Sequence, residues 1–307
     1  MTTIQVKVPA TTANIGAGFD CLGAALTLNN TFRFTPTDAE AKPFSLEVTG
    51  AAVEANKLDA DPDNLLYVAF KYLYEKIGQP IPNIHIAIDL NVPLSRGLGS
   101  SATAIVGGLV GANTLAGSPL KEPEVMQLAI ELEGHPDNVV PALLGGCQLS
   151  VNHQQKWVIC PWAWHKAVIP VVAIPDFELS TEESRLVLPQ QYARAQAIFN
   201  ASRLGLLPHG LAQNHPDYLR ASLDDQIHQP YRKNLIVGYD QVQQAAIDAG
   251  AFGMVISGAG PTLLALTPPD NAEQVAQSMA TAWAKFKINA QTKVLAIASE
   301  GTTVQKI

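Results

Sequence analysis

Apolar and polar positions alternate with a period of two in several parts of the chain, which is the pattern of half-buried strands. Residues 4–8 alternate in this way, and we expect Pro9 to close that first strand. The same pattern predicts further strands around 32–34 and 44–48, and its longest run, over 84–92, is unbroken. The N-terminal half is therefore expected to be rich in strands.

Helical periodicity occurs between these strands. Asp63 or Asn64 is expected to cap a helix that stops at Gly78. A second helix should begin near residue 100, inside a stretch over 97–120 that carries no charge. A membrane-spanning helix needs about 20 mainly apolar residues, but this stretch holds repeated Gly, Ser and Thr. We therefore expect a buried helix and no membrane association.

The pattern changes around residue 165. Beyond it we expect a strand over 168–174, helices over 190–206, 211–223 and 235–249, a hairpin of 252–257 and 262–267, a helix over 272–286 and a strand over 293–298. Without the helices at 190–223 the order is β-α-β-β-α-β, the split βαβ unit of ferredoxin-like domains. The sequence thus predicts an α+β protein with two domains, 1–165 and 166–307.

Composition and charge narrow the class of protein. The chain has 307 residues, of which 47% are hydrophobic and only 15% charged, so a large core and a charge-poor surface are expected. The 20 basic and 27 acidic side chains give a net charge of −7, and no run of Lys or Arg exceeds two. Because a nucleic-acid-binding surface normally carries a basic stripe, we expect no nucleic-acid partner.

The cysteines and the N-terminus indicate the compartment. The three cysteines form no CxxC pair, no disulfide framework and no metal spacing, which favours a reducing environment. The N-terminus lacks the basic-then-apolar order of a signal peptide. We therefore expect a cytoplasmic protein.

The segment after the strand at 84–92 fits an anion-binding site. Gly97, Gly99, Ser100 and Ser101 stand between that strand and the uncharged helix. The first N–H groups of a helix lack intrahelical partners and carry partial positive charge, glycines let a phosphate approach closely, and serine hydroxyls can bind phosphate or Mg²⁺. The alternative is a tight turn in which Ser100 is an ordinary N-cap. The P-loop lysine and the dinucleotide fingerprint are both missing.

The same segment carries a family resemblance. Pro93 and the run Gly97-Leu98-Gly99-Ser100-Ser101-Ala102 resemble the PxxxGLGSSAA motif of the GHMP kinases, with Thr103 in place of the last alanine. Residues 9–20 and 133–141, the latter followed by Gly145-Gly146, are similar to the opening and central motifs of the homoserine kinase family. Residues 256–262 resemble the C-terminal glycine motif of the GHMP kinases. The four motifs occur in the family's order and together identify the chain as a member.

The resemblance implies a fold, a reaction and an assembly. The fold is the two-domain GHMP kinase fold, with a ribosomal-S5-like N-terminal domain over 1–165 and a ferredoxin-like C-terminal domain over 166–307. The implied reaction converts ATP and L-homoserine to O-phospho-L-homoserine and ADP in threonine biosynthesis, with Mg²⁺ as cofactor. The implied assembly is a homodimer.

For the nucleotide, the resemblance implies a site made by the loop and the start of the following helix. Its ATP-binding residues are Asn64, Pro93, Leu94, Ser95, Arg96, Gly97, Leu98, Gly99, Ser100, Ser101, Ala102, Thr103 and Ala104. Asn64 could equally be only a helix N-cap. Ser101, or else Ser100, is expected to bind Mg²⁺ together with Glu131. Glu133 is the competing carboxylate. Residues two apart point to different sides of a helix, so only one of the two glutamates can face the site.

For homoserine, the resemblance implies a site for a zwitterion. A guanidinium matches a carboxylate because it offers two donors at once, and Arg185 and Arg232 are expected to bind the carboxylate. The residues expected around the ammonium and hydroxyl groups are Asn14, Asp20, His135, Asp137 and Thr181, with Gly258 and Gly260 lining the pocket.

Two chemical questions stay open in the sequence. Asp137 is the only candidate general base, but the hydroxyl proton could instead pass directly to the γ-phosphate. Arg96 could stabilise charge on the transferring phosphate or point to solvent. The candidate catalytic residues are therefore Ser101, Glu131 and Asp137.

Three other functions compete with this hypothesis. A GHMP kinase for another alcohol such as mevalonate would leave Asp20 and Asp137 without a cationic partner. A regulatory protein that binds nucleotide without turnover is disfavoured because Glu131, Asp137, Arg185 and Arg232 are all present. RNA binding by an S5-like domain is disfavoured by the net charge of −7.

Overall fold

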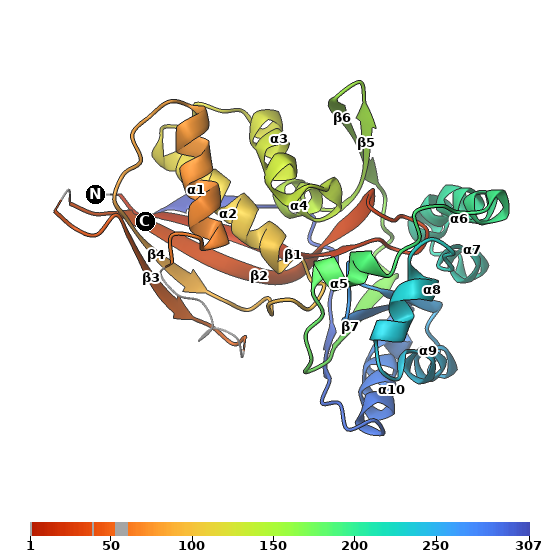
Figure 1. Cartoon of the computed structure of the whole chain (residues 1–307). Coiled ribbons are helices and arrows are strands. Elements are labelled where there is room, and N and C mark those ends of the chain that lie inside the picture. The colour runs from red at the N-terminus through yellow and green to blue at the C-terminus, as the bar shows by residue number, and fades with distance from the viewer. Residues whose placement is uncertain (1, 39, 53–60) are drawn as a thin grey trace.

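The computed structural model describes residues 2–38, 40–52 and 61–307, which fold into two β-sheets with helices around them (Figure 1). The described strands of the larger sheet are β1 (Ile4–Ala13), β2 (Leu22–Pro36), β3 (Phe44–Thr49), β4 (Ile84–Asp89), β5 (Cys147–His153), β6 (Lys156–Trp162) and β11 (Thr303–Lys306). They lie in the order β11-β1-β2-β4-β3, and the first residues of β2 also pair with β5, which pairs in turn with β6. The β3–β4 pair is parallel and the other pairs are antiparallel.

One face of the larger sheet is covered by helices. They are α1 (Leu65–Lys76), α2 (Ser100–Leu115), α3 (Glu122–Glu133) and α4 (Pro136–Leu144) (Figure 1). The alternation that predicts β4 explains this packing, since Ile84, Ile86 and Ile88 are buried in the core that these helices share with the sheet. The strands and helices predicted over 32–92 are thus confirmed in type and order.

The smaller sheet has the predicted ferredoxin-like topology. Its described strands are β7 (Ile169–Ile174), β8 (Gly253–Ile256), β9 (Leu263–Thr267) and β10 (Gln291–Val294), in the order β10-β7-β9-β8 with antiparallel pairs. The remaining elements of this half are α5 (Thr181–Leu186), α6 (Arg194–Gln213), α7 (Pro216–Ser222), α8 (Gln229–Arg232), η2 (Lys233–Leu235), α9 (Tyr239–Asp248), η3 (Pro269–Asn271) and α10 (Ala272–Ala284). The α+β class and the β-α-β-β-α-β order are confirmed.

Both faces of the smaller sheet are buried. Neighbouring residues on a strand point to opposite faces, and in β7 Val171 packs into the core formed with α9 and α10, whereas Val172 packs into a second core. That second core also contains Leu22 and Leu98 from the N-terminal half. A shared hydrophobic core therefore holds the start of α2 against the smaller sheet.

The charge-free helix α2 packs closely because small residues line it. A Cβ atom on Gly108 would overlap the carbonyl oxygen of Leu66 in α1, and one on Gly111 would overlap the ring of Phe34 in β2. The helix is thus a buried element of the core, as predicted. Among the described helices, none has the length and apolar character that crossing a membrane requires.

The prediction that Pro9 closes the first strand is wrong. Strand β11 pairs with residues 4–7 of β1. The pairing with β11 therefore ends before Pro9, and Pro9 does not need to donate a hydrogen bond to it. Proline has no N–H to donate and is tolerated at such an unpaired edge. The pairing with β2 shifts register between Pro9 and Thr11 and then continues to Ala13. The strand therefore carries the chain directly to Asn14.

Several of the described helices and strands were not predicted from the sequence, among them α4, α5, β6, α8 and β11. The two helices predicted over 190–206 and 211–223 are instead one helix, α6, which contains Pro208, and the shorter α7. Proline removes a helical hydrogen bond, but Leu207 and Leu211 on either side of it are fully buried and keep the helix in place.

The domain boundary near residue 165 stays a prediction. Residues before it make the larger sheet and residues after it make the smaller one, but β11 returns to the larger sheet and pairs with β1. The C-terminal end of the chain thus contributes to the N-terminal half.

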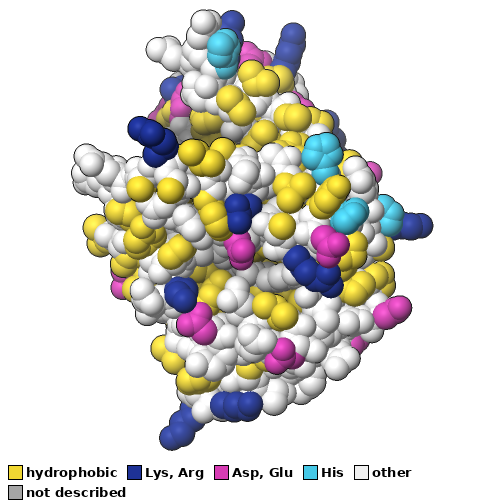
Figure 2. All heavy atoms as spheres, turned by 90° about the vertical axis from the view of Figure 1, so that its right-hand side faces the viewer, with side chains coloured by type: hydrophobic (Ala, Val, Ile, Leu, Met, Phe, Trp, Pro, Cys, Tyr) yellow, Lys and Arg dark blue, Asp and Glu magenta, His cyan; other side chains and the backbone are white. Residues whose placement is uncertain are grey.

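The surface carries few charges, as the composition predicts. Figure 2 shows the side of the molecule that lies to the right in Figure 1, where α6, α7 and α8 are found. On this face Lys, Arg, Asp and Glu side chains lie singly or in small groups among apolar and uncharged polar ones. This agrees with a charged fraction of 15%.

Candidate active site

A cavity of about 340 Å³ lies where the helices of the larger sheet meet the smaller sheet. Both halves of the chain line it. The predicted site residues among its lining are Asn14, Asp20, Asn64, Leu94, Ser95, Arg96, Gly97, Gly99, Ser100, Ser101, Thr103, Ala104, His135, Asp137, Thr181, Arg185, Arg232, Gly258 and Gly260. The structure therefore brings together residues that lie more than 200 positions apart in the chain.

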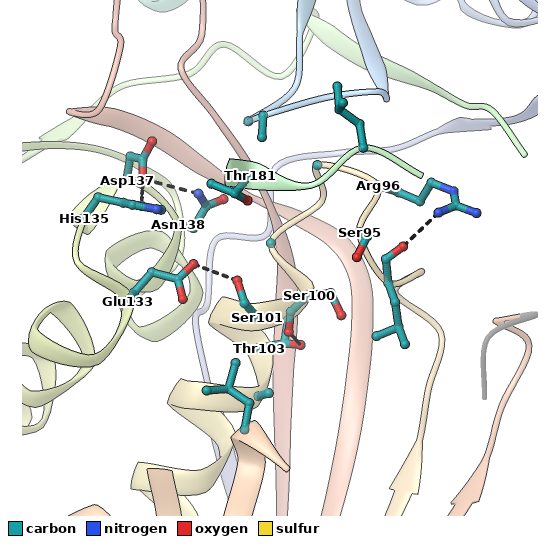
Figure 3. A pocket seen from close by; sticks show the side chains of 18 of the residues that line it. Ser95, Arg96, Ser100, Ser101, Thr103, Glu133, His135, Asp137, Asn138 and Thr181 are labelled. Atoms are coloured by element: carbon teal, nitrogen blue, oxygen red, sulfur yellow. Dashed lines mark hydrogen bonds and ion pairs between the residues drawn. The ribbon is translucent and has the colours of Figure 1, made fainter. Parts of the chain in front are cut away.

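The N-terminus of α2 forms one end of the cavity. Gly99 is the N-cap residue, with a φ of 67° that L side chains rarely adopt, and a Cβ atom there would overlap Oγ1 of Thr11. Ser100 and Ser101 open the helix and line the cavity (Figure 3). Because the first N–H groups of a helix have no intrahelical partner, this end of the cavity offers an anion a row of donors and partial positive charge.

A carboxylate lies directly against this helix end. Ser101 Oγ donates to Glu133 Oε1 at 2.7 Å (Figure 3). Burial raises the pKa of the Glu133 carboxyl, and the hydrogen bond from Ser101 opposes that rise only in part. The charged form of Glu133 is therefore costly and would be stabilised by a cation placed beside it.

Glu131 lies elsewhere, so the expectation that it joins Ser101 is not met. Its carboxylate accepts hydrogen bonds from the Tyr72 hydroxyl at 2.9 Å and from Gln127 Nε2 at 3.0 Å, and Lys76 Nζ lies 3.7 Å away. The reason is helical geometry, because residues two apart on α3 point in different directions. Of the two glutamates left open by the sequence, Glu133 is the one that lines the cavity.

Three other residues of the predicted ATP-binding segment are not among the described lining residues of the cavity. Leu98 and Ala102 are fully buried beneath the loop and the helix, where they pack into the two cores. Pro93 precedes the loop and is partly buried. Asn64 is the N-cap of α1, where its Oδ1 accepts from the Leu66 N–H at 3.1 Å, and it also lines the cavity.

The segment before α4 places an imidazole against a carboxylate. His135 Nδ1 and Asp137 Oδ1 lie 2.7 Å apart, and Asn138 Nδ2 donates to the same oxygen at 3.3 Å (Figure 3). Burial by itself would lower the pKa of His135, but the hydrogen bond and charge of Asp137, with the charge of Glu133, outweigh it and raise that pKa. His135 therefore holds its proton to higher pH than a free imidazole does.

Another part of the cavity, lined from the C-terminal half of the chain, carries two arginines. Arg185 on α5 forms a two-pronged ion pair with Asp20, with N–O distances of 3.0 and 2.8 Å, and this pairing raises the pKa of the guanidinium. Asp20 is held in turn by Asn14, whose Oδ1 accepts from the Asp20 N–H at 2.8 Å. Asn14 also donates to the carbonyl oxygen of Gly258, which ties β1 to the smaller sheet.

Arg232 is a charged residue of the site that is almost fully buried. Its side chain donates to the carbonyl oxygens of Ser184 at 3.1 Å and Gly258 at 3.1 Å, and it lies 5.0 Å above the ring of Phe19. Burial, with the nearby charge of Arg185, lowers its pKa to about 10. Arg232 therefore stays charged near neutral pH and, because a guanidinium has five N–H groups, keeps donors for a ligand.

Arg96 takes neither of the two orientations considered for it. It is only 6% exposed, and its Nε donates to the carbonyl oxygen of Pro175, which follows β7 in the smaller sheet. In Figure 3 its guanidinium points away from Ser100 and Ser101. The side chain therefore links the loop to the other half of the molecule.

The sequence missed two further features of the site. Asn138 lines the cavity and its Oδ1 accepts from the Thr11 hydroxyl at 2.7 Å, an interaction between positions 127 apart. The part of the cavity near Asn64 is lined by apolar side chains, namely Phe32, Leu65, Leu66, Ile88 and Leu90. In the sequence, Asn138 carries no signal beyond the motif that contains it, and the apolar residues appear only as strand and helix positions.

Comparisons with known proteins identify the family of the chain. The families described as "GHMP kinases N terminal domain" and "GHMP kinases C terminal" match residues 64–146 and 196–285. A homoserine kinase of Picosynechococcus sp. is 73% identical over 304 residues, which cover 99% of this chain and 100% of that protein. The crystal structure of homoserine kinase from Cytophaga hutchinsonii has a TM-score of 0.87 and 30% identity, and covers 99% of this chain and 97% of that one.

A more distant likeness concerns the fold alone. The crystal structure of L. major mevalonate kinase in complex with R-mevalonate has a TM-score of 0.73 at 15% identity, covering 95% of this chain and 94% of that one. An identity of 15% says nothing about which substrate this chain binds.

GHMP kinase families match both halves of the chain, and its fold matches that of a solved GHMP kinase. The protein is therefore a GHMP kinase, an enzyme that phosphorylates an alcohol group. An identity of 73% over nearly the whole length narrows the class further. The chain belongs to the homoserine kinase family, as its four motifs predict.

Proposed function

We propose that this chain transfers the γ-phosphoryl group of ATP to the side-chain hydroxyl of L-homoserine and releases O-phospho-L-homoserine and ADP. The observation that carries the proposal is that one cavity holds an anion-binding helix N-terminus at one end and Arg185, Arg232 and Asp20 at the other. A triphosphate matches the first end and an amino acid zwitterion matches the second.

At the nucleotide end, the loop over 94–99 and the first turn of α2 hold the phosphates. Backbone N–H groups and the hydroxyls of Ser100 and Ser101 supply the donors. The apolar lining near Asn64 receives the base, since ring systems are bound by apolar surfaces with a few polar groups. Phosphoryl transfer requires positioning and charge neutralisation more than covalent chemistry, which suits a site built from backbone and hydroxyls.

Ser101 and Glu133 fit Mg²⁺. This ion prefers oxygen ligands and is held by one or two carboxylates together with substrate phosphates and water, and a hydroxyl and a carboxylate 2.7 Å apart supply such a pair. In the described part of the chain no group of three or more His, Cys, Asp or Glu side chains could hold a metal by itself, so the phosphates must complete the site. When bound, Mg²⁺ would neutralise negative charge on the transferring phosphate.

At the acceptor end, Arg185 and Arg232 bind the carboxylate of homoserine through the N–H groups that their present partners leave over. Asp20 and Asp137 face the ammonium group, and His135 and Thr181 lie beside them.

We assign Asp137 to hold the substrate, because its Oδ1 already accepts two hydrogen bonds. The hydroxyl proton then passes to the phosphate. In this case D137N raises the KM for homoserine and keeps a measurable kcat, whereas a general-base role predicts loss of kcat.

The test compares three acceptors in an assay of ADP release: L-homoserine, R-mevalonate and 4-hydroxybutyrate, which has the carboxylate and hydroxyl of homoserine but no ammonium. We expect turnover with homoserine and little with the other two. Turnover with mevalonate alone would contradict the proposal, and nucleotide binding without turnover on any acceptor would favour a regulatory protein. Chelation of divalent cations should stop the reaction, and light scattering measures the proposed homodimer.

A further inference from the structure

The carbonyl oxygens of the phosphate loop are bonded to the smaller sheet. The Thr262 N–H donates to the Arg96 carbonyl at 3.2 Å, and the Ser257 hydroxyl donates to the Gly97 carbonyl at 2.6 Å. A Cβ atom on Gly97 would overlap the carbonyl oxygen of Ser257, so the two backbones are in direct contact. The turn over 257–262 thus holds the C-terminal side of the loop.

The segment that follows β7, residues 175–179, holds the other side of the loop, in part through the side chain of Arg96. The Leu179 N–H donates to the Ser95 carbonyl at 3.4 Å. Arg96 NH1 donates to the Leu94 carbonyl at 3.2 Å while its Nε donates to Pro175, and NH1 lies 3.5 Å from Oε1 of Glu178. The guanidinium therefore fastens the loop to the segment that follows β7.

These contacts have an electrostatic consequence. A carbonyl oxygen carries partial negative charge, so a loop that cradles phosphates must turn its carbonyls away and its N–H groups inward. All the carbonyls of residues 94–97 are occupied by other donors. The phosphate-binding shape of this loop thus depends on the smaller sheet and on Arg96.

The segment held by Arg96 leads straight into the acceptor end. Residues 175–179 are followed within two positions by Thr181, the first residue of α5, and Arg185 lies on the same helix. Both of these residues line the cavity. The side chain of Arg96 is therefore a direct connection between the phosphate loop and the element that carries the expected ligands of homoserine.

We propose that Arg96 is a positioning residue that couples the two substrate sites, so that nucleotide in the loop increases the affinity for homoserine and homoserine increases the affinity for nucleotide. The proposal rests on the proposed function for the identity of the two ligands. Because coupling between two sites is reciprocal, the same factor must appear in both directions. Arg96 touches neither reacting atom and acts through the placement of α5.

The experiment measures homoserine binding by calorimetry with and without a saturating non-hydrolysable ATP analogue. In the wild-type protein we expect the analogue to tighten homoserine binding by about fivefold or more, within the usual range of allosteric coupling. In R96K and R96Q, which cannot bridge the same carbonyls, we expect a factor below about twofold. A merely structural role would lower the melting temperature and leave this factor unchanged.

A matched control is R203Q, since Arg203 also donates to a backbone carbonyl but lies on α6 outside the cavity. It should keep the wild-type coupling factor. If neither Arg96 variant folds, E178K decides, because Glu178 is about half exposed and the new ammonium would repel Arg96. The inference is overturned if a folded Arg96 variant, or E178K, keeps the coupling factor of the wild-type protein. It is also overturned if the wild-type protein phosphorylates homoserine but shows no coupling between the two ligands. Failure of wild-type turnover would instead overturn the proposed function.

Discussion

The two ends of the cavity are built in different ways. The phosphate end uses backbone and small side chains of one continuous segment, Gly97, Gly99, Ser100 and Ser101 among them. The acceptor end uses charged side chains from separate parts of the chain, such as Asp20, Arg185 and Arg232. A phosphate can be recognised by N–H groups that any sequence with the right backbone offers. A zwitterion carries two opposite charges, and this part of the cavity offers charged side chains of both signs.

The largest expected effect concerns Glu133, which is hydrogen-bonded to Ser101 at the start of α2. E133Q should lower kcat by about 100-fold or more, the usual cost of losing one group that stabilises developing charge. Because burial raises the pKa of Glu133 in the folded protein, the same variant should unfold at an equal or higher temperature than wild type at pH 8. Steady-state kinetics and thermal melts measure both.

E131Q is the matched control for this prediction. Glu131 is hydrogen-bonded to Tyr72 and Gln127 outside the cavity, so its loss should leave kcat within about twofold of wild type. An equal loss of kcat in E131Q would return the metal site to the position that the sequence favoured.

The next effect isolates the acceptor end. R232A removes a charge-assisted contact of about 1.5–3 kcal/mol, so the KM for homoserine should rise by about 10- to 150-fold. The KM for ATP should change little, because the hydrogen bonds of Arg232 are to Ser184 and Gly258 rather than to the first turn of α2. R220A, which breaks an exposed pair with Asp217, is the control and should change neither value. An unchanged KM for homoserine in R232A would show that carboxylate binding has been misplaced.

A smaller effect isolates the phosphate end. In G99A a side chain must adopt a φ of 67° and overlap Thr11, so we expect a loss of stability of about 1–3 kcal/mol and a higher KM for ATP. In G117A the φ is also positive, at 86°, but a Cβ atom meets nothing within 4 Å. That variant should lose stability only and keep the KM for ATP. Equal kinetics in the two variants would mean that the loop geometry does not matter for nucleotide binding.

The smallest effect is a dependence of stability on pH. The pKa of His135 is raised above 6.5 in the folded state by Asp137 and Glu133, against the effect of burial. Its contribution to stability is therefore fully present below about pH 6.5 and is lost as the pH rises through the raised value. The difference in unfolding free energy between wild type and H135Q should shrink between pH 6 and 9. A difference that is constant or grows would contradict the raised pKa.

The elements that the sequence predicted best are those whose pattern is local. The alternation over 84–92 gives β4, and the order of elements after residue 165 gives the ferredoxin-like sheet. Two of the features that it missed depend on distant parts of the chain. β11 exists because it pairs with β1 at the other end of the chain, and α6 continues through Pro208 because its neighbours bury Leu207 and Leu211.

The sequence by itself determined the family and predicted the phosphate-binding loop, because glycines, serines and a following helix define backbone geometry within a dozen adjacent residues. It also supplied the charged residues of the acceptor end, but not their arrangement. Only the tertiary structure decided that Glu133 rather than Glu131 lies beside Ser101, and that Arg96 reaches Pro175. The physical reason is that the direction of a side chain depends on how its helix or loop is turned against its neighbours, and those neighbours come from the rest of the chain.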